Sequence, residues 1–343
     1  MSSSFNSFCF GKTSVVEDKP RGSKKDLNAS IEICKNDLIS EVVREFPNLQ
    51  GVMGYYYATH AKKNKVIAEA ILQQYMPQST KENIPDKIIS QLLALLDKLD
   101  TLIGFFVIGR QPTASKDPYA LRWSALGIIR IIINGRHNIN LNSLVEKAIN
   151  SYKSQLKIRI NSTHVGSQII KFIMERYENF LKENQKYDMV LLNSYYIDYD
   201  KLNLTQINMA ILELESFFKK SEAKTMLIAF KRVFNLIDDS KNTEKLYDLL
   251  DPSLFIKSEE KILYNKIKEL DKATNKNTTH KDFNLLFSLL LELCKPINEF
   301  FAKVKINDDK KSIRENRLSL LLNLKMKVNK VLNFSIIIKG RDL

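Results

Sequence analysis

The tripeptide Gly11-Lys12-Thr13 is the first stretch of this sequence whose residue types could do chemistry, because it matches the last three residues of a phosphate-binding P-loop. A P-loop has a second glycine five residues earlier, which lets backbone amides wrap around the phosphates. Position 6 of this chain is Asn6, and no strand–loop–helix pattern follows. The tripeptide therefore does not predict a nucleotide site.

Residues that could hold a metal are few and far apart. The histidines of the chain are His60, His137, His164 and His280. A helical metal-dependent phosphohydrolase needs an adjacent His-Asp pair, whereas the best candidate here reads Thr59-His60-Ala61. Asp97 and Asp100 share a helix face, but two carboxylates without imidazoles bind a transition metal weakly. We therefore predict no metal site, and a metal-dependent phosphohydrolase of this type stays as the alternative enzyme.

Nucleophilic catalysis is not indicated either. The sequence has no Gly-x-Ser-x-Gly elbow, and its cysteines lack an evident histidine partner. Cys9, Cys34 and Cys294 lie far apart, which argues against a disulfide framework and is typical of a reducing cytosol. We predict no catalytic residue in this chain.

The charge balance points to a polyanionic partner. The chain has 53 Lys and Arg against 39 Asp and Glu, a net charge of +14, and nucleic acid is the commonest polyanion in the cytosol. Arginine binds phosphate with two parallel hydrogen bonds, and asparagine can read a base edge in a single-stranded loop. Candidate RNA contacts are Lys231 and Arg232, beside Phe230 and Phe234, and then Arg314, Asn316, Arg317, Lys325 and Lys327. The alternative is that these residues are only the solvated faces of amphipathic helices.

A second basic candidate lies at Lys116-Asp117-Pro118, followed by Arg122. The sequence predicts a helix start here, where backbone N–H groups could meet a phosphate. The alternative is that Asp117 simply caps the helix, with Pro118 at a position where its missing N–H has no cost.

The elements that must position these residues are predicted to be helices throughout. Glycine (10) and proline (8) are scarce, and apolar residues recur at three- and four-residue steps. Ser143 and Glu146 have the spacing of a capping box, and Thr279 with Asp282 resembles a helix start. Pro296 predicts a kink beside Cys294. The expected helices cover residues 88–106, 119–132, 143–156, 165–181, 205–218, 226–237, 259–273, 280–303 and 309–332.

The predicted organisation is all-α and multi-domain. Residues 1–26 read as a disordered leader, which lacks the apolar core of a signal peptide. We expect helical domains at 27–157 and 201–343, joined by a helical linker at 158–200. The longest apolar run, 127–133, is interrupted by Arg130 and is too short to cross a bilayer. We therefore expect a cytoplasmic protein with no membrane partner.

Several ordered motifs resemble the β-subunit of bacterial heterotetrameric glycyl-tRNA synthetase. The resemblance covers about residue 30 to the C-terminus, which makes it more specific than any single match. Its main motifs are Glu45-Phe46-Pro47-Asn48-Leu49-Gln50-Gly51, Asp97-Lys98-Leu99-Asp100-Thr101-Leu102, Lys116-Asp117-Pro118-Tyr119-Ala120-Leu121-Arg122, Phe230-Lys231-Arg232-Val233-Phe234-Asn235, and Arg314-Glu315-Asn316-Arg317-Leu318.

The resemblance implies one fold and one function. The fold would be a degenerate His-Asp-type (HD-like) helical domain, a linker and an anticodon-binding domain akin to that of arginyl-tRNA synthetase (DALR-like). The function would be recognition of tRNA(Gly) for ATP-dependent glycylation, with Lys231, Arg232, Arg314, Asn316 and Arg317 on the anticodon arm and Lys116 and Arg122 on the tRNA body. Glycine, ATP and magnesium would be handled by the separate α-subunit, so this chain itself needs no cofactor.

The chain also departs from the family pattern. The family commonly has His-Asp where this chain has His60-Ala61, and a second arginine where Trp123 stands. A full β-subunit has a large N-terminal half ahead of this region. We therefore expect as partners tRNA(Gly), the α-subunit and a separately encoded N-terminal β-fragment, with a nonfunctional split-gene remnant as the remaining alternative.

Overall fold

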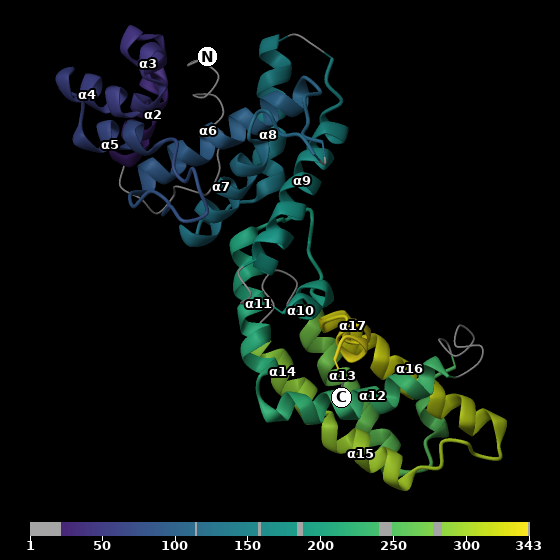
Figure 1. Ribbon diagram of the computed structural model, residues 1–343. Helices are drawn as coiled ribbons and strands as arrows, with labels where there is room; N and C mark the ends of the chain where they lie inside the picture. The colour runs from purple at the N-terminus through teal and green to yellow at the C-terminus, as the bar shows by residue number, and fades with distance from the viewer. Residues whose placement is uncertain are drawn as a thin grey trace. The chain divides into compact units, whose positions relative to one another are not determined.

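The computed structural model describes residues 22–113, 115–156, 159–183, 188–239, 249–276 and 283–341. Within these residues every regular element is an α- or 3-10 helix (Figure 1), which confirms the all-α expectation. Gly11-Lys12-Thr13, Cys9, His280 and the predicted helix start at Thr279 and Asp282 lie outside the described residues. The first described helix begins at Gly22, five residues before the predicted start of the helical region at Leu27.

The chain divides into two compact units. Unit 1 comprises the described residues of Met1–Asn184 and Ile197–Asn208, and unit 2 those of Gln185–Tyr196 and Met209–Leu343. The predicted linker, 158–200, contributes α9 (Ser162–Glu183) to unit 1 and α10 (Met189–Ser194) to unit 2.

Unit 1 is built around one apolar helix, α6 (Ile88–Val107). Five of its large apolar residues, Leu93, Leu95, Leu99, Leu102 and Ile103, are at most 2% exposed, because helices pack on several sides of it. These neighbours include α5 (Lys65–Gln73), α7 (Leu121–Asn134) and α8 (Leu141–Leu156). Besides α9, the unit contains the start of α11 (Leu204–Phe218) up to Asn208. Its remaining elements are α2 (Gly22–Ile33), η2 (Asn36–Ile39), α3 (Glu41–Glu45), η3 (Pro47–Leu49) and α4 (Val52–His60).

Two helix starts in unit 1 differ from their predicted positions. α7 begins at Leu121, not at Tyr119, because Ala120 adopts a left-handed conformation with φ 55°. Asp117 still caps the helix, accepting hydrogen bonds from the backbone N–H groups of Leu121 and Arg122 at 2.9 Å each. The predicted capping box at Ser143 is wrong: Asn140 Oδ1 accepts from Ser143 N at 3.0 Å, and α8 starts at Leu141.

Unit 2 packs a second set of helices around an aromatic core. α12 (Ser221–Asp238) and α13 (Ser258–Lys276) each contact α14 (Phe283–Glu292), α15 (Cys294–Lys303) and α16 (Lys311–Val331). The rings of Phe217 and Phe287 stack with centroids 3.9 Å apart, and those of Phe230 and Phe334 meet edge to face at 5.2 Å. The unit also contains η5 (Pro252–Leu254), α17 (Phe334–Lys339) and the end of α11 (Leu204–Phe218) from Met209 onward.

The predicted kink near Cys294 is confirmed. α14 ends at Glu292 and α15 begins at Cys294, so the helical series is interrupted at Leu293. Pro296 has no N–H to donate to the carbonyl of Glu292, one turn earlier, which explains the position of the break.

The glycines of unit 1 provide a stability test. A Cβ at Gly54 would lie 2.6 Å from Ile71 Cγ2, whereas a Cβ at Gly166 would find its nearest neighbour at 3.6 Å. We expect Gly54→Ala to lower the free energy of unfolding by about 1–3 kcal/mol through overpacking. Gly166→Ala, the matched control within α9, should raise it by about 0.5–1 kcal/mol through helix propensity. Urea unfolding followed by circular dichroism measures both; equal effects would contradict the packing.

Candidate RNA-binding surfaces

The most accessible of the predicted RNA contacts in unit 2 is Arg232 on α12. Its side chain is exposed, and its guanidinium carbon lies 4.5 Å from the centre of the Phe301 ring on α15. Its Nη1 atom is 3.5 Å from Oδ1 of Asn298, which precedes Phe301 by about one turn of α15. Lys231 is half-buried beside it, while Phe230 and Phe234 point into the core at 1% and 3% exposure. The pair Lys231-Arg232 therefore lies at the rim of the aromatic core.

Arg317 on α16 is buried. It is 3% exposed, and its Nε lies 2.9 Å from Glu260 Oε1, which belongs to a residue with no exposed surface. Its Nη1 donates to Asp308 Oδ2 and to the carbonyl of Lys305, both at 2.8 Å. Glu260 Oε2 in turn accepts from the N–H groups of Ile256 and Lys257, at the start of α13. This guanidinium therefore holds protein elements together, in place of the RNA contact that the sequence predicted.

Asn316 is also used within the protein. The side chain is 1% exposed, its Oδ1 accepts from Asp251 N at 2.8 Å, and its Nδ2 donates to Asp251 O at 3.0 Å. The amide thus pairs with both backbone groups of one residue, as a neighbouring strand would. Its hydrogen bonds go to the segment before η5 and leave the amide little surface for a base.

The other cations of α16 have partners in the described structure. Arg314 is half-buried and donates through Nη1 to the carbonyl of Asp308 at 3.0 Å. Lys325 Nζ lies 2.5 Å from Asp238, and Lys327 Nζ lies 2.9 Å from Asp271. The structure thus brings Arg314 and Arg317 together around Asp308, and places Lys231 and Arg232 on a different helix.

In unit 1 the structure decides between the two explanations of the α7 start. The carboxylate of Asp117 occupies the N–H groups of Leu121 and Arg122, so capping is what these groups do. Lys116 is exposed in a turn whose ends are joined by Thr113 N to Lys116 O at 3.0 Å. Arg122 is half-buried and donates to the carbonyl of Thr113.

Two aromatic residues near this start were missed by the sequence reasoning. Tyr119 is 41% exposed and stacks on Phe105 with centroids 4.0 Å apart, and Trp123 is 47% exposed. Exposed rings beside cations are common where proteins contact unpaired bases. The signal was present in the sequence, since Trp123 is the single tryptophan and directly follows Arg122.

The carboxylates that could have served a metal have other partners. Asp97 forms an ion pair with Lys35 at 2.5 Å, and Asp100 Oδ1 accepts from the hydroxyl of Tyr152 at 2.8 Å. Burial raises the pKa of Asp100, and the Tyr152 hydrogen bond opposes that shift. His60 is exposed at the end of α4. Among the residues that the structure describes, no group of three or more His, Cys, Asp or Glu side chains is arranged to hold a metal ion.

Two family profiles match this chain, and together they cover most of the residues described above. The family profile described as "Glycyl-tRNA synthetase beta subunit" matches residues 12–194, and the profile "DALR anticodon binding domain" matches residues 226–334. The chain belongs to the glycyl-tRNA synthetase β-subunit family. This confirms the resemblance drawn from the sequence motifs, and the comparisons give no support to a phosphohydrolase.

Similar proteins carry the name "Glycine--tRNA ligase beta subunit". One from Rickettsia peacockii (strain Rustic) is 41% identical over 313 residues, which are 91% of this chain and 45% of that protein. Another from Rickettsia typhi (strain ATCC VR-144 / Wilmington) is 40% identical over 309 residues, 90% of this chain and 44% of that protein. The chain therefore spans slightly less than half the length of these curated relatives.

The family's DALR match falls entirely within unit 2. It runs from the middle of α12, through Lys231 and Arg232, to Phe334 at the start of α17. Arg314, Asn316 and Arg317 lie in the same stretch. Lys116 and Arg122 lie instead within the β-subunit match of unit 1.

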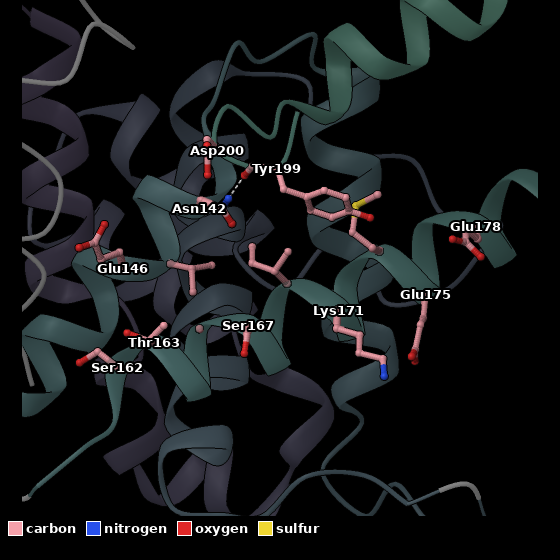
Figure 2. A pocket seen from close by; sticks show the side chains of 14 residues that line it. Asn142, Glu146, Ser162, Thr163, Ser167, Lys171, Glu175, Glu178, Tyr199 and Asp200 are labelled. Carbon is pink, nitrogen blue, oxygen red and sulfur yellow. Dashed lines mark hydrogen bonds between the residues drawn. The ribbon is translucent and has the colours of Figure 1, made fainter. Parts of the chain in front are cut away.

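A groove in unit 1 has the opposite charge to these candidate surfaces (Figure 2). It encloses about 760 Å³ between α8, α9 and the Tyr199–Asp200 turn, which Asn142 holds by donating to the Tyr199 carbonyl. Four carboxylates and one lysine line it: Glu146, Glu175, Glu178, Asp200 and Lys171. Its acidic lining repels phosphate, so we do not count it as an RNA-binding surface. No described helix is both long and apolar enough to cross a membrane.

Substitution of the buried Arg317 and of the half-buried Arg314 tests whether Arg317 has a structural role that Arg314 lacks. Arg317→Met should lower the free energy of unfolding of unit 2 by about 3–5 kcal/mol, because it leaves the buried carboxylate of Glu260 without its countercharge. Arg314→Met removes a half-exposed hydrogen bond and should cost about 1 kcal/mol. Urea unfolding of both variants provides the comparison. Equal losses would show that Arg317 is not structural.

Lys98 gives a test based on pH. The side chain is 7% exposed, donates to the carbonyl of Tyr75 at 2.9 Å, and burial lowers its pKa to about 8. Between about pH 8 and 9 the unfolded chain therefore binds more protons at Lys98 than the folded one, so Lys98 should make the stability of unit 1 rise with pH. The raised pKa of the Cys34 thiol, caused by burial, opposes this rise above about pH 9. Lys98→Met should abolish the rise, whereas Lys63→Met at an exposed position should keep it. Thermal unfolding at a series of pH values measures the difference; an unchanged rise in Lys98→Met would refute the assignment.

Proposed function

We propose that this chain is the tRNA-binding part of a glycine–tRNA ligase β-subunit and recognises tRNA(Gly) while the bond-forming chemistry takes place on another polypeptide. The observation that carries the proposal is the DALR anticodon-binding match over the unit that displays Arg232 on its surface. The net charge of +14 supports it, because phosphate neutralisation supplies much of the affinity of RNA-binding proteins.

The contacts with RNA follow from the accessibility of each cation. Arg232, Lys231 and Arg314 are our candidates for the anticodon arm, and Lys116 with Arg122 for the tRNA body. Asn316 and Arg317 act as positioning residues, since their polar atoms bind Asp251, Glu260 and Asp308. This assignment keeps the predicted surface and changes the role of two of its residues.

The partners of the proposed enzyme follow from the name shared by the relatives. A β-subunit works with an α-subunit, and we propose that the α-subunit binds glycine, ATP and magnesium. The polypeptide that corresponds to the remaining half of the relatives' length would complete the β-subunit, as a separate N-terminal fragment or otherwise. Such an enzyme acts in the cytoplasm, and this chain contributes recognition of the RNA.

The salt dependence of tRNA(Gly) binding tests the proposal. The logarithm of the binding constant should fall linearly with the logarithm of the salt concentration, because bound cations release counterions from the phosphates. The double variant Arg232→Ala with Arg314→Ala should bind more weakly, and the slope should fall by about one for each phosphate that the variant no longer neutralises. Filter binding across a salt series gives both quantities.

A matched control removes the same charge elsewhere. Lys63→Ala with Lys81→Ala takes two exposed lysines from unit 1 and should change affinity and slope much less. The proposal fails if binding shows no salt dependence, or if the two double variants behave alike. A glycylation assay with the α-subunit and the rest of the β-subunit tests the enzyme itself. Synthesis of glycyl-adenylate by this chain alone would contradict the assignment of the chemistry to another polypeptide.

A further inference from the structure

The contact between Arg232 and Phe301 places a planar cation over an aromatic ring at the surface of unit 2. Arg232 is exposed although its guanidinium carbon lies over the Phe301 ring, 4.5 Å from the ring centre, so solvent reaches part of the side chain. Asn298 and Phe301 are three residues apart on α15 and therefore share a helix face. The exposed amide of Asn298 lies 3.5 Å from Nη1 of Arg232. A planar cation and an amide are thus presented side by side.

The ring beneath this cation is packed against the core of unit 2. Phe301 meets Phe300 edge to face, with centroids 6.1 Å apart, and Phe300 has no exposed surface. α15 in turn packs against both α12 and α13. The ring beneath the guanidinium is therefore held by packed helices, and a support that is in place before a ligand binds lowers the entropy cost of stacking on the cation.

Other cations that lie over rings in unit 2 are differently placed. Arg341 lies over Phe218 but is paired with the carboxylate of Asp188, and Lys325 lies over Phe234 but is paired with that of Asp238. Lys268 lies over Tyr264, but its ammonium group has no planar face. The side chain beside the Arg232 guanidinium, Asn298, is neutral. Arg232 therefore combines a ring-supported plane, exposure and an amide neighbour that could bind the edge of a flat ligand.

We propose that the outer face of the Arg232 guanidinium stacks on one unpaired nucleobase of the RNA, with the amide of Asn298 within reach of that base's edge. A base in a helix has both faces covered by its neighbours, so only a nucleotide in a loop or bulge can stack in this way. The inference rests on the proposed function and deepens it. In this arrangement Arg232 recognises the flat shape of a base by stacking, in addition to attracting phosphates through its positive charge.

A double-mutant cycle between protein and RNA tests the stacking. Transcripts of tRNA(Gly) are prepared with each anticodon-loop nucleotide made abasic in turn, and their affinities are measured for the unchanged chain and for Arg232→Lys. Lysine keeps the positive charge and loses the planar face. At one position, removal of the base should weaken binding to the unchanged chain roughly tenfold. For Arg232→Lys that effect should shrink to about twofold or less.

Arg314→Lys is the matched control, since it makes the same exchange at a guanidinium that, within the described part of the chain, lies over no aromatic ring. It should preserve the full effect at the abasic position. The stacking is refuted if base removal weakens binding equally for the unchanged chain and Arg232→Lys at every loop position, while salt-dependent tRNA binding persists; the proposed function then survives. If the chain does not bind tRNA(Gly) at all, both proposals fail.

Discussion

The buried guanidinium of Arg317 is the interaction on which the arrangement of unit 2 depends. A charge that loses its water must find countercharges and hydrogen-bond acceptors, and Arg317 finds them in Glu260, Asp308 and the carbonyl of Lys305. Because Glu260 also accepts the N–H groups of Ile256 and Lys257, the same network fixes the start of α13 against α16. α13 packs on α15, so this network also supports the helix that places the half-buried Phe301 ring beneath Arg232.

This constraint separates two uses of positive charge that composition cannot distinguish. Arg317, Lys325 and Lys327 each face a carboxylate, so much of their charge is neutralised within the protein. A net charge of +14 therefore measures the field around the chain and not the number of phosphate contacts. Arg232 suits the proposed RNA contact because it is exposed and lies over an aromatic ring.

Local signals in the sequence predicted most of the fold. The three- and four-residue recurrence of apolar residues located α6 closely, and the missing N–H of Pro296 located the break before α15. Predictions failed where the environment of a residue depends on a partner far away in the sequence, or where a neighbouring residue takes the same role. Nothing within α16 shows that Arg317 meets Glu260, 57 residues earlier, so an amphipathic pattern made a buried cation look like a surface one. Similarly, Asn140 displaced Ser143 as the cap of α8, because both are good capping residues.

Charge also restricts how RNA could approach unit 1. Near the start of α7, exposed Lys116 lies in the same loop and helix start as the exposed rings of Tyr119 and Trp123. Along α8 and α9 the groove carries Glu146, Glu175, Glu178 and Asp200 against the single cation Lys171. A polyanion is attracted to the first surface and repelled by the second, and over distances of about 8–10 Å salt screens neither effect completely. Within unit 1 the acidic groove and the start of α7 therefore present opposite charges to a polyanion.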